Sequence, residues 1–199
     1  ISGEEEAEYA YLGAISNLHN SEVSMVIDIG GSSTEIIYGE GFNILSKNSL
    51  QLGSVSGTEQ FLKHSPPLKV ETENFSDLIK EMFFGFEKNL FPKKVIAIAG
   101  TATTLACMKM GLKEFEENKV DKCIINIQDI RNIIGELNSI TTNEILDKFG
   151  PVMNGREDII LAGAIILQQF VENFSIENII VSTRGIRYGA IVKYLERSI

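Results

Sequence analysis

Residues Val26–Ile36, with the sequence VIDIGGSSTEI, combine two carboxylates with two glycines and three hydroxyl side chains. Aspartate, glycine and serine are poor strand formers, so the stretch predicts a hairpin tip between two strands. Glycine lacks a Cβ, which lets backbone N–H groups approach a ligand, and successive exposed amides form an anion site. The candidate phosphate-binding residues are Gly30, Gly31, Ser32 and Ser33.

The two carboxylates of this stretch point to a metal. Asp28 does not bind phosphate itself, but it can hold a hydrated Mg2+ that does, and Glu35 across the tip can complete the metal shell. The alternative is an ordinary glycine-rich hairpin with surface carboxylates, and so short a motif does not choose between the two.

A second anion site is predicted at Gly100 and Thr101, within the sequence GTATT. These residues follow a buried strand and open a helix, where free amides and the helix dipole favour phosphate. No lysine follows in the spacing of a P-loop. The alternative is a threonine N-cap beside a glycine required for packing.

A third strand-to-helix turn carries Arg184 and Arg187 in the sequence STRGIR. Both guanidinium groups would face the same cleft and could pair with phosphate oxygens in a bidentate manner. The alternative is a pair of solvated arginines at a helix end. Arg156, before an apolar helix, could equally form a structural ion pair with Glu157 or Asp158.

The candidate general base is Glu6, in the sequence ISGEEEAEYAYLG. Acidic residues in a first helical turn usually compensate the helix dipole, and this explanation is strongest for Glu4. Glu6 lies at the edge of the apolar stripe that includes Ala7 and Ala10. A carboxylate held there, near a cleft, can have a raised pKa and accept a proton from water.

The elements that must position these residues follow from periodicity and turn residues. A capping box at Ser2 and Glu5 opens the first helix, which should end near Asn20. The predicted strands are Met25–Ile29, Thr34–Tyr38, Phe42–Leu52, Val95–Ala99 and Asn178–Val181, with Cys123–Ile127 as a candidate for one more. Further helices are predicted at Phe75–Leu90, Gly100–Met110, Gln128–Leu137, Asn143–Lys148, Arg156–Phe174 and Gly185–Arg197.

This order predicts an α/β fold, with a mixed five-stranded sheet flanked by helices. It resembles the ribonuclease-H-like, actin-like ATPase domain found in actin, Hsp70 and sugar kinases. In that architecture the first hairpin and the later strand-to-helix turns face one cleft.

Composition limits the class of protein. The chain has 199 residues, 44% of them hydrophobic, and a formal net charge of −9. General nucleic-acid binding needs a basic surface and is not expected. Two separated cysteines and the lack of a secretory signal favour a cytoplasmic protein, and no apolar run is long enough to cross a membrane. Because the chain begins at Ile1, we expect further sequence upstream.

Six stretches together resemble the exopolyphosphatase and guanosine pentaphosphate phosphatase (Ppx/GppA) family. They occur in the family's order and cover nearly the whole chain: ISGEEEA, VIDIGGSSTE, SLQLGSV, AGTATTLA, REDIILAGAIIL and VSTRGIRYG. The resemblance implies that residues 1–199 form the second actin-like domain of a two-domain phosphatase. Its own N-terminal domain would complete the cleft, so the isolated chain is expected to be inactive.

The resemblance also implies the chemistry. Glu6 matches the family's catalytic glutamate, which activates the water that attacks a terminal phosphorus, and Asp28 and Glu35 match carboxylates that place Mg2+ or water. The expected substrates are inorganic polyphosphate or guanosine pentaphosphate (pppGpp), an alarmone of the stringent response. Arginines common in the family are replaced here by Glu8 and by Ser56, which weakens the case for a long polyanionic substrate.

Two other functions stay open at this stage. One is an ATP-dependent kinase or ATPase of the actin superfamily, with an adenosine pocket near Gly100 and the turn at residues 182–189. The other is a non-catalytic sensor that binds an alarmone. The sequence does not give the oligomeric state, and a homodimer is left open.

Overall fold

The structure is a computed structural model that describes residues 2–17, 22–86 and 92–196. Its strands are β1 (Val23–Ile29), β2 (Thr34–Glu40), β3 (Asn43–Leu50), β4 (Lys94–Ile98), β5 (Ile124–Asn126) and β6 (Asn178–Val181). They form one mixed sheet in the order β3-β2-β1-β4-β6-β5. The first three strands are antiparallel neighbours, β1, β4 and β6 run parallel, and β5 is antiparallel to β6.

The predicted α/β class and mixed sheet are confirmed, but the predicted number of strands is wrong. The described residues form six strands, not five, because β5 adds an antiparallel edge next to β6. This strand has only three residues, and Ile124 at its start is exposed. It lies within Cys123–Ile127, the candidate for one more strand, which is therefore confirmed. A segment so short has too little alternation for its sequence alone to decide between strand and loop.

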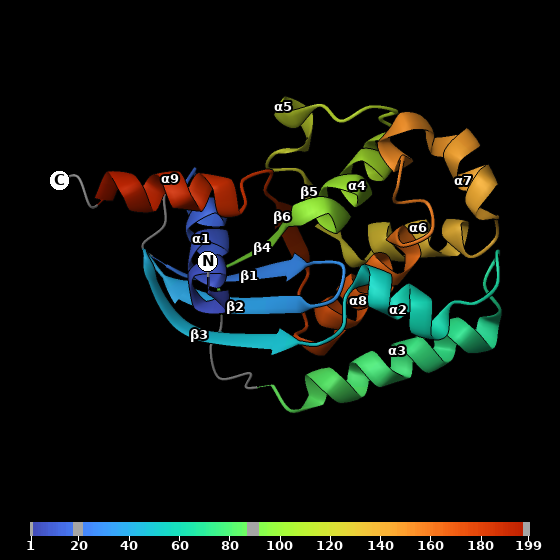
Figure 1. Cartoon of the computed structure of the whole chain (residues 1–199), viewed down its shortest axis with the longest axis horizontal. Coiled ribbons are helices and arrows are strands. Elements are labelled where there is room, and N and C mark those ends of the chain that lie inside the picture. The colour runs from blue at the N-terminus through green and yellow to red at the C-terminus, as the bar shows by residue number, and fades with distance from the viewer. Residues whose placement is uncertain (1, 18–21, 87–91, 197–199) are drawn as a thin grey trace.

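The helices are α1 (Gly3–Ile15), α2 (Ser54–Phe61), α3 (Lys69–Phe84), α4 (Ala99–Met110), α5 (Glu117–Val120), α6 (Ile127–Leu137), α7 (Thr142–Phe149), α8 (Ile160–Asn173) and α9 (Ile186–Glu196), with a 3-10 helix η1 at Gly150–Met153. In Figure 1, α9 lies across α1 at the left, beside the strands, whereas the other helices gather to the right. None of the described helices is long and apolar enough to span a membrane.

Two hydrophobic cores follow from the alternation of side chains along β1. Met25, Ile27 and Ile29 belong to the larger core, with α3, α4, α6 and α8. Val26 belongs to the smaller core, beneath α1 and α9. Asp28 is two residues beyond Val26, so its side chain points to the α1 side of the sheet.

Helices α1 and α9 pack so closely that their backbones meet. A Cβ added at Gly13 would overlap the carbonyl group of Gly185, and one added at Gly189 would overlap the carbonyl group of Tyr9. Glycine is therefore required at both positions. These contacts fix the position of α1, which carries Glu6.

Some helices and helix boundaries differ from the sequence-based predictions. Helix α2 was not predicted, α3 begins at Lys69 rather than at Phe75, and α8 begins at Ile160, after a series of turns that starts near Arg156. The helix ends predicted near Asn20 and Leu90 are wrong, because α1 ends at Ile15 and α3 at Phe84. The end predicted at Arg197 lies outside the described residues.

Candidate active site

Glu6, Asp28 and Glu35 line one pocket of about 250 Å3, which we call the acidic pocket. Asp28 and Glu35 face each other in the register of β1 and β2, and the alternation of both strands directs them to the α1 side. Helix α1 supplies Glu6 from above them. The pocket's full lining is Gly3, Glu6, Ala7, Ala10, Asp28, Ser33, Glu35, Lys47, Ser49 and Gln51.

The first turn of α1 is held by its predicted capping box, which is confirmed. The backbone N–H of Glu5 donates to Ser2 Oγ at 3.2 Å, and the backbone N–H of Ser2 donates to Glu5 Oε2 at 2.8 Å. Ala7 is buried against the sheet. In addition, Lys47 Nζ of β3 donates to the carbonyl oxygen of Gly3. These contacts place the exposed carboxylate of Glu6 over the strands.

The Asp28 carboxyl group is affected by its burial and by the two neighbouring carboxylates. Burial, followed by repulsion from Glu35 and then from Glu6, raises the pKa of the Asp28 carboxyl group to about 6. Glu35 is positioned by Ser49, whose hydroxyl donates to Glu35 Oε1 at 3.1 Å, and Gln51 Nε2 donates to Ser49 Oγ at 3.4 Å.

The donor set suits Mg2+ better than a metal held entirely by protein. Among the described residues, no three or more His, Cys, Asp or Glu side chains are close enough together to hold a metal ion. Mg2+ keeps several of its waters and needs only one or two carboxylates. Three carboxylates around one pocket, with a raised pKa at Asp28, form a local excess of negative charge that a hydrated cation would relieve.

The carbonyl groups and the amides of the turn between β1 and β2 differ in their hydrogen bonding. The carbonyl oxygen of Gly30 accepts from the backbone N–H of Ser54 at 2.9 Å, and that of Gly31 accepts from the N–H groups of Val55 and Ser56 at 2.8 and 3.0 Å. The turn is thus bound by its carbonyl groups to the start of α2. Within the described structure, the amides of the three residues that follow Gly30 have no acceptor: Gly31, Ser32 and Ser33. Such amides form an anion-binding nest.

A second pocket, of about 550 Å3, adjoins the acidic pocket at Asp28, which lines both. We call it the arginine pocket, because Arg156 and Arg187 line it. The starts of α4 and α9 meet there, as expected for turns at the carboxyl ends of parallel strands. Its lining is Asp28, Ile98, Ala99, Gly100, Thr103, Phe115, Arg156, Thr183, Gly185, Ile186, Arg187 and Tyr188.

Arg156 is the residue whose importance the sequence did not reveal. Its guanidinium lies directly over Gly100, where an added Cβ would overlap it. The anticipated ion pair with Glu157 or Asp158 is absent from the described structure; instead Glu157 Oε2 accepts from the backbone N–H of Arg156 at 2.9 Å. The guanidinium therefore keeps its donors for a ligand at the start of α4.

The predicted anion site at Gly100 and Thr101 divides in two. Gly100 lines the arginine pocket, but the Thr101 side chain is buried, with its hydroxyl 3.5 Å from the carbonyl oxygen of Ile29. Of Thr101, only the backbone N–H, in the first turn of α4, is left to serve an anion. Ala99, which also lines the pocket, has a φ of 64°, a conformation that costs a residue with a Cβ of the order of 1 kcal/mol or more.

The two arginines near the start of α9, Arg184 and Arg187, also differ in their surroundings. Arg187 is exposed and lines the arginine pocket. Arg184, in the turn before α9, is directed toward α9 and the end of α1: its guanidinium carbon lies 5.2 Å from the centre of the Tyr188 ring, and Nη1 donates to Ser16 Oγ at 3.4 Å. Arg187 is therefore the residue placed to meet an anion.

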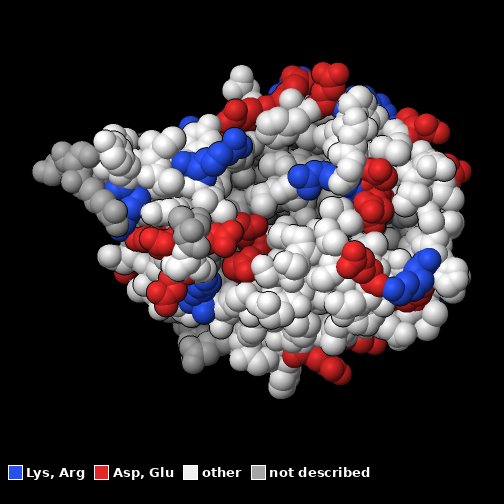
Figure 2. Space-filling model, in the orientation of Figure 1, with Lys and Arg blue, Asp and Glu red and all other residues white. Residues whose placement is uncertain are grey.

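The charges on the surface follow this arrangement. In Figure 2, acidic side chains gather next to the N-terminal end of α1, beside a hollow. Basic side chains lie above this acidic group, near the start of α9, and across the hollow from it, toward the middle of the molecule. One side of the hollow can thus hold a cation and the other a polyanion.

Sequence reasoning did not anticipate the wall that β3 contributes to the acidic pocket. Lys47, Ser49 and Gln51 alternate along the chain, and Ser49 pairs with Glu35 in the register of β2 and β3. The period of two would have placed them on the face of Glu35 once that register was known.

Known proteins resemble this chain over nearly its full length. Residues 1–198 match the family model described as the Ppx/GppA phosphatase family. The chain is 27% identical over 197 residues to exopolyphosphatase 2 of Mycobacterium tuberculosis, covering 95% of this chain and 61% of that protein. It is 26% identical over 205 residues to a guanosine-5'-triphosphate,3'-diphosphate pyrophosphatase of Photobacterium profundum, covering 99% of this chain and 39% of that protein.

The fold agrees with these relationships. The crystal structure of the Aquifex aeolicus Ppx/GppA phosphatase, type II variant, superposes with a TM-score of 0.91 at 30% sequence identity, over 97% of this chain and 64% of that one. The chain spans less than two thirds of the length of each of these relatives.

Proposed function

Because the chain belongs to the Ppx/GppA phosphatase family, we propose that it carries the catalytic half of a hydrolase that removes the terminal phosphate of inorganic polyphosphate or pppGpp. The observation that supports this proposal most strongly is the position of Asp28. It joins a pocket with three carboxylates to a pocket with two arginines and the start of a helix.

Phosphoryl transfer requires that the reacting groups are positioned and that negative charge is neutralised, and different residues of the site serve these two roles. Glu6 orients the attacking water and accepts its proton. The oxygen of that water forms a bond to the terminal phosphorus, and the bond from that phosphorus to the bridging oxygen breaks. The shortened chain leaves with the negative charge, next to Arg156 and Arg187.

The phosphate oxygens meet two sets of amides. Those of Gly31, Ser32 and Ser33 have no acceptor among the described residues, and Ser33 lines the acidic pocket. The first turn of α4 faces the arginine pocket with the positive end of its dipole. Both sets are fixed before substrate arrives, so little reorganisation accompanies the reaction.

Mg2+ is the expected cofactor, and Asp28 and Glu35 would hold it. When bound, it would neutralise charge on the phosphate oxygens. Ser49 would then orient Glu35 toward the ion through the hydrogen bond already described. The part of the relatives that this chain does not match is the proposed source of the other wall of the cleft.

Phosphate release by the full-length protein tests the proposal. Purified protein would be incubated with pppGpp, long-chain polyphosphate or ATP, with Mg2+ or with a chelator, in water enriched in oxygen-18. We expect Mg2+-dependent release of orthophosphate that carries one labelled oxygen. Turnover of ATP alone would favour the kinase or ATPase alternative, and tight binding without any release would favour a sensor; either result refutes the proposal.

A further inference from the structure

A third pocket lies beyond Arg156, on the side away from Asp28. It has a volume of about 420 Å3 and is lined by Thr103, Thr104, Glu114, Phe115, Pro151, Val152 and Arg156. We call it the Phe115 pocket. It shares Thr103, Phe115 and Arg156 with the arginine pocket, so a ligand that begins at Asp28 can continue into it. Its volume is within the range of about 300 to 1,000 Å3 typical of small-molecule sites.

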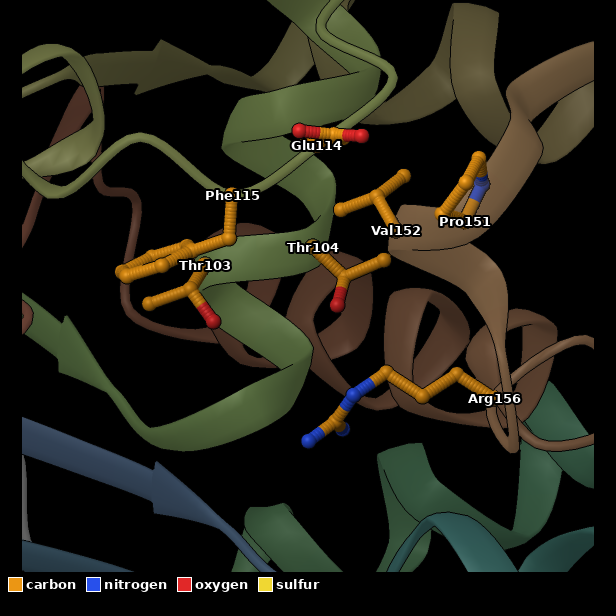
Figure 3. Close-up of a pocket in the computed structure, with 7 residues that line it drawn as sticks. All are labelled: Thr103, Thr104, Glu114, Phe115, Pro151, Val152 and Arg156. Carbon is orange, nitrogen blue, oxygen red and sulfur yellow. The ribbon is translucent and has the colours of Figure 1, made fainter.

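The walls of this pocket suit a flat, apolar group. Figure 3 shows the Phe115 ring on one side and Val152 with Pro151 on the other, with Arg156 below. Phe115 is 52% exposed, so a large part of its side chain is uncovered. An exposed aromatic ring next to an anion site can stack with a nucleobase.

The pocket is held in shape by its own backbone. The N–H of Val152 donates to the carbonyl oxygen of Lys113 at 2.9 Å, which ties η1 to the loop that carries Glu114 and Phe115. The same loop is joined to the end of α4 by the N–H of Leu112, which donates to the carbonyl oxygen of Cys107 at 2.9 Å. The two walls are therefore connected before a ligand binds.

Glu114 decides which ligand fits. It has no ion pair within the described structure, and in Figure 3 its carboxylate lies at the top of the pocket, away from Arg156. A carboxylate only accepts hydrogen bonds and repels further phosphate groups. This end of the cleft is therefore unsuited to a continuing polyphosphate chain.

Guanine is the nucleobase whose edge matches a carboxylate. Its N1–H and N2–H donors lie side by side and can bind both carboxylate oxygens. Adenine presents one donor, N6–H, beside the acceptor N1, which the carboxylate repels. A site built to accept hydrogen bonds discriminates strongly against a ligand that lacks the donor.

We propose that the Phe115 pocket binds the guanine base of a guanosine polyphosphate, with Phe115 stacking on the base and Glu114 accepting from its N1–H and N2–H. The protein is then a nucleotide phosphatase rather than an exopolyphosphatase. The hydrolysis of the bound nucleotide rests on the proposed function; the binding of the guanine base does not.

Equilibrium binding tests the assignment separately from catalysis. The full-length protein would be titrated with GTP, ITP, ATP and inorganic tripolyphosphate, which carry similar charge and differ in the base. We expect GTP to bind at least about tenfold more tightly than ITP, which lacks the 2-amino group, and than ATP. Equal affinity for GTP, ATP and tripolyphosphate would overturn the proposal.

Two substitutions identify the residues. Phe115→Ala should weaken the binding of GTP about tenfold or more and leave the binding of tripolyphosphate unchanged. Glu114→Gln should bring the affinities for GTP and ITP close together. The matched controls are Phe84→Ala, a ring 85% exposed on α3, and Glu59→Gln, on α2; neither should change any affinity. If Phe115→Ala weakens the binding of tripolyphosphate as much as the binding of GTP, the base does not bind in the Phe115 pocket.

The outcomes separate the two proposals. Base-dependent binding without phosphate release supports the guanine site and refutes the hydrolase. Release from polyphosphate and pppGpp at equal efficiency, with no effect of Phe115→Ala, supports the hydrolase and refutes the guanine site.

Discussion

Replacing Gly100 by alanine should weaken phosphate binding without lowering stability, because the residue that must move is Arg156, the arginine that we propose binds phosphate at the surface of the pocket. The added Cβ would occupy the position of the Arg156 guanidinium. That group is the end of a flexible side chain, so it can move away at little cost in folding free energy. Gly100 does not have a positive φ and lies in the first turn of α4, where alanine is favoured over glycine by up to about 1 kcal/mol.

The expected loss of binding follows from the donors that Arg156 withdraws. A hydrogen bond to a charged group contributes about 1.5–3 kcal/mol. Losing one such bond lowers affinity by about 10- to 150-fold. The assay is titration with inorganic tripolyphosphate, together with urea denaturation of the free protein. We expect weaker binding by about this factor and a free energy of unfolding that is unchanged or slightly increased.

A control and a double-mutant cycle make this prediction specific. Gly135 is an exposed glycine in α6 with no atom within 4 Å of an added Cβ, so Gly135→Ala should raise stability similarly and leave binding unchanged. In an Arg156→Ala background, Gly100→Ala should cause little further loss, because the displaced group is already missing. The reasoning is refuted if Gly100→Ala binds normally, or if its effect simply adds to that of Arg156→Ala.

Three further predictions concern the acidic pocket and the helices that hold it. Because the pKa of Asp28 is raised from 3.8 to about 6, the folded chain binds this proton more tightly than the unfolded chain, so the free energy of unfolding should fall by about 3 kcal/mol as the pH rises from about 4 to 6. Urea denaturation across this range should show the slope, which Asp28→Asn or saturating Mg2+ should largely remove; a slope that persists in Asp28→Asn assigns it to other groups. Gly189→Ala should destabilise the fold by about 1–3 kcal/mol in urea, because its Cβ would meet the backbone of Tyr9, and normal stability would contradict the close packing of α1 and α9. Ser49→Ala should raise the Mg2+ concentration needed for half-maximal activity by about tenfold, through loss of its hydrogen bond to Glu35, and a lower maximal rate at an unchanged Mg2+ requirement would contradict this role.

The sequence predicted those parts of the fold that rest on long periodic segments. Strand-forming residues at Met25–Ile29 and Thr34–Tyr38, with poor strand formers between them, predicted the first hairpin. The register of that hairpin explains why Asp28 and Glu35 share a face. The capping box at Ser2 located the start of α1. The turns at Gly100 and Arg187 were placed at the ends of parallel strands, and the structure brings them into one pocket.

Helix α2 was missed because its stability comes from tertiary contacts. Its sequence, SVSGTEQF, contains a glycine and three hydroxyl residues, which are weak helix formers. The carbonyl groups of Gly30 and Gly31 satisfy its first amides, and Gly57 lies against Phe75, where an added Cβ would overlap the ring. A local pattern does not contain either contact.

The site residues that escaped prediction share a similar cause. Arg156 has neighbours of opposite charge in the sequence, which suggested an ion pair, and its position over Gly100 depends on packing between segments more than fifty residues apart. Phe115 belongs to a loop without periodicity. Thr101 was predicted correctly to lie at a helix start, but the direction of its side chain, into the core, follows from its contact with Gly163 of α8.

The most direct test of the proposed catalytic site compares two neighbouring glutamates of α1. Glu6 lines the acidic pocket, whereas Glu4, in the same exposed first turn, does not. Steady-state phosphate release from pppGpp would be measured for the full-length Glu6→Gln and Glu4→Gln variants at saturating Mg2+. We expect Glu6→Gln to lower the maximal rate by about 100-fold or more while substrate still binds, and Glu4→Gln to keep the normal rate. A Glu6→Gln variant that releases phosphate at the normal rate would contradict the assignment of Glu6 as the base.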